Sequence, residues 1–124
     1  MDTEKYRELY LTEAHKHLMA IERAAVALRS TPLDAESLEG GSRAAHTLKG
    51  MSAMMGYGQL AHLAGEVETL FGGLEHGTSA GNGELADMLT ECLAALRELL
   101  EDVVAGDTHE VDLTSLVRRM RALA

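Results

Sequence analysis

Residues 43–71 read RAAHTLKGMSAMMGYGQLAHLAGEVETLF, and the pattern within and just beside this stretch indicates how the chain folds. Apolar and small residues recur on both sides of Gly56-Tyr57-Gly58 at the three- and four-residue spacing of an α-helix. The recurring positions are Leu38, Ala45, Leu48, Ser52 and Met55 before this break, and Leu60, Leu63, Val67, Leu70 and Leu74 after it. The stretch therefore predicts two amphipathic helices joined by a turn that contains glycine.

The same spacing extends outward to five helices in the whole chain. We expect them over about residues 3–29, 34–55, 59–76, 84–105 and 112–123. Gly40-Gly41 is expected to weaken the second helix, because a helical glycine costs about 1 kcal/mol relative to alanine. No segment shows the alternation of a β-strand. The pattern predicts an all-α fold, an antiparallel four-helix bundle whose fifth, C-terminal helix packs on it as an accessory helix or begins a connection to a following domain.

The composition limits the domain count and the classes of function. The 124 residues suffice for one domain, which we expect to span residues 1–124. Eleven Lys and Arg against 20 Asp and Glu give a net charge of −9, which disfavours nucleic acid and acidic membranes as partners. The single cysteine excludes an internal disulfide and the usual cysteine-based zinc sites. No apolar run is long enough to span a bilayer, so we expect a cytoplasmic protein without membrane insertion.

His46 has the most informative surroundings of the six histidines. The helical pattern turns it away from the buried position Leu48 and towards solvent. Lys49 follows it by three residues and Arg43 precedes it by three, so both cations flank the imidazole on one face, while Gly50 removes bulk beside the ring. An exposed imidazole beside cations suits visits from a phosphate-bearing active site, with Arg43 and Gly50 as partner contacts. The alternative is an ordinary solvated helix face.

The remaining histidines give weaker indications of a site. Four of them are expected to be solvated surface residues: His15, His17, His76 and His109. His62 and Glu66 share a helix face, where we expect a surface hydrogen bond. No histidine follows a glutamate by three residues, as a di-iron bundle would require.

The stretch over residues 43–71 resembles the phosphorylation-site region of histidine-containing phosphotransfer (HPt) domains, most closely that at the N-terminus of the chemotaxis kinase CheA. The flanks agree: YRELYLTEAHKHLMAIERAAVAL resembles the first helix of CheA-type domains, ELADMLTECLAALRELLEDVVAGD the fourth, and DLTSLVRRMRAL the fifth. The resemblance thus covers nearly the whole chain. It implies a four-helix bundle with an accessory helix.

The resemblance also implies roles for individual residues. His46 matches the phosphoacceptor, Lys49 the cation that stabilises phosphoryl charge, and Glu68 the glutamate that orients the histidine ring. One departure concerns Gly65, which stands where CheA domains often have a second histidine near the site. The resemblance therefore implies membership of the HPt family, with this one difference from the CheA type.

The function implied by the resemblance is that of a phosphoryl carrier in two-component signalling. His46 would accept phosphoryl from ATP through a separate histidine kinase catalytic domain and pass it to an aspartate of a CheY-like response regulator receiver domain. The domain itself would be a monomeric carrier and no enzyme, although a CheA-like parent would be an ATP-dependent protein histidine kinase. The chain has no phosphate-binding glycine loop, so ATP and magnesium are expected to belong to the partners, with no cofactor or metal bound here.

Three other functions remain open from the sequence. The first is a free-standing HPt intermediate of a multistep phosphorelay, which would receive its phosphoryl group from a receiver domain. The second is a helical metal- or ligand-binding bundle. The third is a structural interaction domain in which His46 has no chemistry.

Overall fold

The computed structural model describes residues 3–30, 34–75, 82–106 and 110–123. These residues form five α-helices and no strand, so the predicted all-α class is confirmed. The helices are α1 (Thr3–Ala27), α2 (Ala35–Met54), α3 (Gly58–Glu75), α4 (Asn82–Ala105) and α5 (Thr114–Leu123). None of the described helices combines the length and the apolar character that crossing a bilayer requires.

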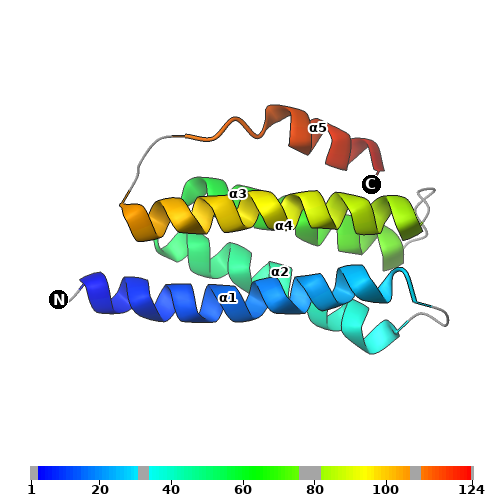
Figure 1. Cartoon of the computed structure of the whole chain (residues 1–124), viewed down its shortest axis with the longest axis horizontal. Helices are drawn as coiled ribbons and strands as arrows, with labels where there is room; N and C mark the ends of the chain where they lie inside the picture. The colour runs from blue at the N-terminus through cyan, green and yellow to red at the C-terminus, as the bar shows by residue number, and fades with distance from the viewer. Residues whose placement is uncertain (1–2, 31–33, 76–81, 107–109, 124) are drawn as a thin grey trace.

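The first four helices form the predicted bundle. Successive helices run in opposite directions (Figure 1), and α1 packs on α2, α2 on α3, α3 on α4 and α4 on α1. The helix α5 packs on α3 and α4, outside this ring of four. The sequence therefore predicted both the bundle and the accessory position of its last helix.

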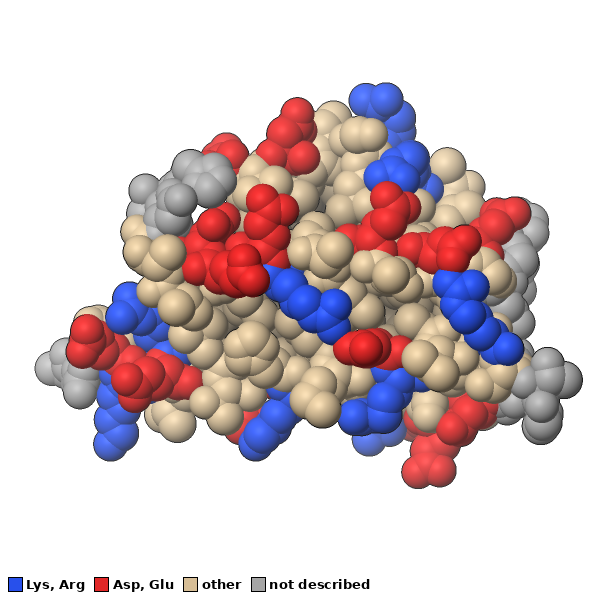
Figure 2. Space-filling model, in the orientation of Figure 1, with Lys and Arg blue, Asp and Glu red and all other residues tan. Residues whose placement is uncertain are grey.

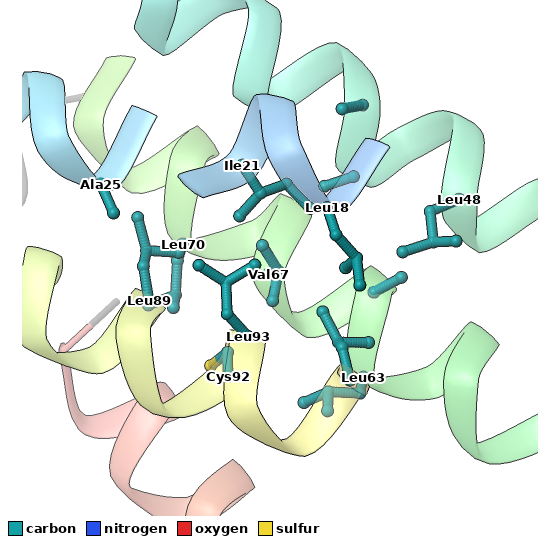
Figure 3. Packing of buried hydrophobic residues seen from close by; sticks show 14 of the residues in the cluster. Leu18, Ile21, Ala25, Leu48, Leu63, Val67, Leu70, Leu89, Cys92 and Leu93 are labelled. Atoms are coloured by element: carbon teal, nitrogen blue, oxygen red, sulfur yellow. The ribbon is translucent and has the colours of Figure 1, made fainter. Parts of the chain in front are cut away.

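The bundle interior contains aliphatic side chains from all four helices (Figure 3). The largest of the fully buried side chains are Ile21, Leu48, Leu63, Leu85, Leu89, Leu96, Leu100 and Met120. The buried hydroxyl of Ser52 forms a 2.7 Å hydrogen bond with the phenol of Tyr10, which satisfies both groups between α1 and α2. Burial raises the pKa of Tyr10 to about 12, so this hydroxyl stays protonated.

The start and end of α2 follow from local chemistry. Asp34 caps the N-terminus, where its carboxylate accepts hydrogen bonds from the backbone N–H of Ser37 and from the Ser37 hydroxyl. At the other end, Gly56 has a φ of 78°, a conformation that side chains disfavour, and it turns the chain into α3.

Gly41 does not behave as the sequence predicted. A Cβ atom at this position would lie 2.5 Å from Cβ of Ala24 in α1 and 2.9 Å from Cζ of Phe71 in α3. Gly41 is therefore a point at which α1, α2 and α3 approach one another closely, and its missing side chain favours the packing. Only Gly40, where an added Cβ would meet nothing within 4 Å, fits the expected loss of helix stability.

The helix α5 begins two residues later than predicted. Asp112 lies before the helix, where its carboxylate accepts a hydrogen bond from the backbone N–H of Thr114, the first helical residue. The preceding segment is fixed to α3, because the Gln59 amide both donates to the carbonyl of Val111 and accepts from its N–H. Two ion pairs fasten the helix further, Arg119 with Glu91 of α4 and Arg121 with Glu66 of α3.

Candidate functional site

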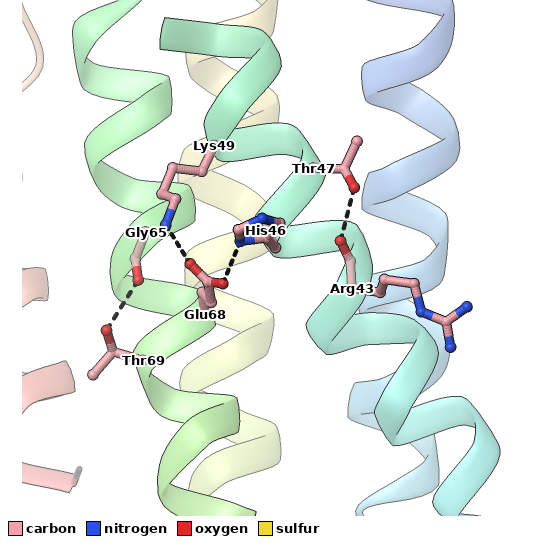
Figure 4. A network of polar contacts seen from close by, with 7 residues as sticks. All are labelled: Arg43, His46, Thr47, Lys49, Gly65, Glu68 and Thr69. Atoms are coloured by element: carbon pink, nitrogen blue, oxygen red, sulfur yellow. Dashed lines mark hydrogen bonds and ion pairs between the residues drawn. The ribbon is translucent and has the colours of Figure 1, made fainter.

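Side chains from α2 and α3 converge on the carboxylate of Glu68 (Figure 4). Nδ1 of His46 lies 2.6 Å from one of its oxygens, Oε2. Nζ of Lys49 donates a 2.6 Å hydrogen bond to the other, Oε1. The structure thus brings together the three residues to which the resemblance assigns chemistry, although 22 positions separate His46 from Glu68.

The helical period places these groups at the outer edge of the contact between α2 and α3. Ala45 and Leu48 are fully buried in the bundle, whereas the side chain of His46 between them is 66% exposed. Lys49 lies one turn beyond His46 on the side facing α3, and its side chain is 42% exposed. Solvent therefore reaches the imidazole while the backbone beneath it is held by the core.

The charge on Glu68 determines which tautomer of the neutral His46 ring is favoured. The hydrogen bond from Lys49 lowers the pKa of Glu68 most, the hydrogen bond with His46 adds to this, and partial burial opposes both. Glu68 is consequently an ionised carboxylate at neutral pH, and a carboxylate can only accept hydrogen bonds. Nδ1 of His46 must then carry the proton that it donates to Glu68. In the neutral ring, Nε2 keeps its lone pair.

Arg43 does not join this network, contrary to the expectation that it flanks the imidazole. Its guanidinium donates a 3.0 Å hydrogen bond to Glu39, one turn earlier in α2, and points away from His46 in Figure 4. Lys49 is therefore the cation that shares an acceptor with His46.

Gly50 leaves open space beside the imidazole. A Cβ atom built on it would meet nothing within 4 Å, and the residue is exposed. No packing or turn in the structure requires glycine here, because its φ is not positive. The feature fits the predicted contact with a partner, which stays a prediction.

Gly65 lies beside Lys49, a contact that the helical period does not predict. A Cβ atom at this position would be 3.2 Å from Cδ and 3.8 Å from Cγ of Lys49. The lysine stem thus crosses α3 where the side chain is absent. A glycine inside a helix was the available signal, since glycine costs stability there unless something approaches the backbone.

The other histidines do not build a second site in the described part of the chain. The predicted hydrogen bond between His62 and Glu66 is wrong, because Glu66 instead accepts a 2.6 Å hydrogen bond from Arg121 of α5. His76 and His109 lie outside the described residues. Within the described ranges, His, Cys, Asp and Glu form no group of three that could hold a metal ion.

Comparisons with known proteins agree on one family. The family model of the Hpt domain matches residues 5–106. The chain is 30% identical over 120 residues to the chemotaxis protein CheA of Bacillus subtilis. These residues make up 97% of this chain and 18% of that protein. The CheA of Listeria monocytogenes is 29% identical over 116 residues, covering 94% of this chain and 19% of that protein. No solved structure matches the chain.

The match covers only a small part of each relative. A third relative, the CheA of Halobacterium salinarum, is 27% identical over 118 residues, which cover 95% of this chain and 18% of that protein. The chain thus spans less than a fifth of the length of the curated relatives named here.

Proposed function

The chain belongs to the Hpt domain family, and from this premise we propose that it carries a phosphoryl group on His46 in chemotaxis-type two-component signalling. The observation that supports the proposal most is the hydrogen bond between Nδ1 of His46 and Glu68. It fixes one tautomer of an exposed imidazole and makes Nε2 the nucleophile.

The proposed reaction is an in-line displacement at phosphorus. The Nε2 lone pair attacks the γ-phosphorus of ATP bound to a separate histidine kinase domain, the bond to the β-phosphate oxygen breaks, and ADP leaves. The proton stays on Nδ1, where Glu68 stabilises the positive charge that the ring acquires. In the second step an aspartate of a receiver domain attacks the same phosphorus, the N–P bond breaks, and neutral His46 is restored.

Lys49 acts in both steps by lowering the cost of the negative charge on the transferring group. Its ammonium shares Glu68 with the ring and comes from the same helix, one turn from His46. Phosphoryl transfer depends mainly on positioning and on stabilising this charge. The domain therefore acts as substrate and carrier, while the kinase and receiver domains supply ATP, magnesium and the rest of the catalytic groups.

The direction of transfer is proposed from the relatives. Those named above are CheA proteins, which favours a kinase as the donor and a CheY-like receiver as the acceptor. A multistep phosphorelay would use the same imidazole with a receiver domain as donor. Labelling by a kinase domain with ATP, compared with labelling by a phosphorylated receiver domain, distinguishes the two directions.

Replacement of His46 tests the proposal directly. We expect the wild-type chain to become labelled when mixed with radiolabelled ATP and the catalytic part of a CheA protein, and to form phosphohistidine with phosphoramidate, detected by phosphorus NMR. The variant His46→Gln should remain unlabelled with an unchanged circular dichroism spectrum, because a carboxamide is not a nucleophile. The control His62→Gln should be labelled like the wild type. Labelling of His46→Gln, or no labelling of the wild type by either donor, would contradict the proposal.

A further inference from the structure

The stem of Lys49 has to cross α3 to bring its ammonium to Oε1 of Glu68. Gly65 lies in its path, three residues before Glu68. Beyond the local helix backbone, the atoms that an added Cβ at this position would meet within 4 Å are Cδ and Cγ of Lys49. The lysine stem therefore lies directly against the backbone of α3 at Gly65.

We propose that Gly65 is the positioning residue for Lys49. Because Gly65 has no side chain, it leaves a track, the bare surface of α3 along which the lysine stem reaches Glu68. This inference rests on the proposed function of His46 and deepens it. Gly65 has no side chain with which to contact the imidazole or the carboxylate of Glu68. Its effect on phosphoryl transfer therefore passes through Lys49.

No other feature of the structure accounts for a glycine at this point. Its φ is not positive, so the backbone does not require it. It lies inside α3, where glycine lowers helix stability relative to alanine. The tight packing seen at Gly41, against Ala24 and Phe71, has no counterpart here.

The long lysine side chain explains why the track matters. The side chain is 42% exposed, and a free lysine stem would sample many rotamers. Contact with the bare backbone of α3 restricts these rotamers to those that direct the ammonium to Glu68. An added methyl at 3.2 Å pushes the stem outward by a few tenths of an ångström, and a leucine side chain occupies the track itself.

Two matched pairs of variants test the proposal in the full chain. Gly65→Ala and Gly65→Leu are compared with Gly72→Ala and Gly72→Leu, because Gly72 lies on the same helix and its added Cβ would meet nothing within 4 Å. We expect Gly65→Leu to slow phosphorylation by phosphoramidate about tenfold or more, as a misplaced charge-stabilising group does, and Gly65→Ala to slow it less. Both Gly72 variants should react like the wild type. All four should be at least as resistant to urea as the wild type, since each removes a helical glycine.

A spectroscopic readout shows whether the effect passes through Lys49. The Lys49 hydrogen bond contributes most to the low pKa of Glu68, so the carboxyl carbon of Glu68 should titrate at higher pH in Gly65→Leu than in the wild type or in Gly72→Leu. In a Lys49→Met background, Gly65→Leu should change neither this titration nor the rate any further.

The outcomes separate this inference from the proposed function. If Gly65→Leu leaves the rate and the Glu68 titration unchanged, or slows transfer equally in the Lys49→Met background, the positioning role is wrong while His46 can still be the phosphoacceptor. If the wild type takes up no phosphoryl group, the proposed function fails. The titration of Glu68 then still reports whether Gly65 positions Lys49.

Discussion

Glu68 divides its two carboxylate oxygens between two donors from a neighbouring helix. Oε2 receives Nδ1 of His46 and Oε1 receives Nζ of Lys49, each at 2.6 Å. One side chain therefore orders both the ring and the cation that we propose for phosphoryl transfer. Since the Glu68 side chain is only 29% exposed, the core beneath it limits how far this arrangement can move.

Removing the Lys49 charge tests that cation at the level of one residue. We expect Lys49→Met to slow phosphorylation of His46 by about tenfold to a hundredfold, because the negative charge on the transferring group loses its stabilising partner. The free energy of unfolding should change little, since half-exposed ion pairs contribute little to stability. Phosphoramidate kinetics and urea unfolding measure the two effects. Lys16→Met, which removes an exposed cation of α1 paired with Glu13, is the control and should leave the rate unchanged.

Glu68 also predicts a dependence of stability on pH. Its folded-state pKa is below the ordinary value of 4.5, so in acid the unfolded chain binds the proton more readily than the folded chain does. The stabilisation from this carboxylate is present above about pH 4.5 and is lost as the pH falls through the lower folded-state pKa. The free energy of unfolding should therefore fall less for Glu68→Gln than for the wild type when the pH is lowered from neutral to about 3. Urea unfolding at both pH values measures this, and an equal fall in the two proteins would contradict it.

The sequence predicted some single residues of the site and missed others. Exposure of His46 follows from the helical period, and Lys49 from its spacing of three residues. Glu68 could not be placed by spacing, because it lies on another helix, and only the resemblance to HPt domains indicated it. The pairing of Arg43 with Glu39 and the contact of Lys49 with Gly65 depend on rotamers and on the distance between helices, which periodicity does not determine.

The contact between α1, α2 and α3 depends on one of two adjacent glycines. Gly41→Ala should destabilise the fold by about 1–3 kcal/mol, because the new methyl would lie 2.5 Å from Cβ of Ala24 and the helices must separate. Gly40→Ala should instead stabilise it by up to about 1 kcal/mol, since the space there is open. Urea unfolding of the two variants measures both. Stabilisation of both variants would show that helix propensity outweighs packing at this contact, and destabilisation of Gly40→Ala would contradict the open space there.

The helices themselves were predictable, whereas some of their ends and contacts were not. A period of 3.6 residues gives the number of helices and the buried side of each, because burial of that side holds the bundle together. The start of α5 depends on whether Asp112 lies before the helix and accepts the Thr114 N–H or joins the helix, and the sequence permits both. Gly41 shows the same limit, since a glycine that weakens an isolated helix strengthens a contact between helices.

Acidic and basic side chains are mixed on the surface of the molecule. Figure 2 shows acidic and basic side chains interspersed over the face in view, within a chain of net charge −9. Several basic side chains are engaged in ion pairs, among them Arg97 with Glu22, which joins α4 to α1, and Arg29 with Asp87, which joins the turn after α1 to α4. In the transfer that we propose, a phosphate-bearing partner would approach a mostly acidic molecule, and the ammonium of Lys49 would then matter more locally.

The accessory helix can be removed to test whether it serves the site or only the bundle. Ending the chain after Glu110 removes α5, and with it the buried side chains of Leu113, Val117 and Met120. We expect a loss of about 3 kcal/mol or more in the free energy of unfolding, from this apolar burial. Phosphorylation of His46 should persist under conditions where the truncated chain is folded, because Glu66, which contacts α5, lies about 200° around α3 from Glu68. Calorimetry and phosphoramidate labelling measure the two effects, and a folded truncated chain that takes up no label would contradict this separation.

Under the proposed function, the exposed ring of His46 sets a condition on how signals can pass through the domain. One imidazole on the outside of a helix can enter only one active site at a time, so the donor and the acceptor compete for the same place and must alternate. Throughput is then limited by how soon each visitor departs, and a long-lived complex with either one would block the other. Brief encounters of modest affinity are the arrangement that such a relay point requires.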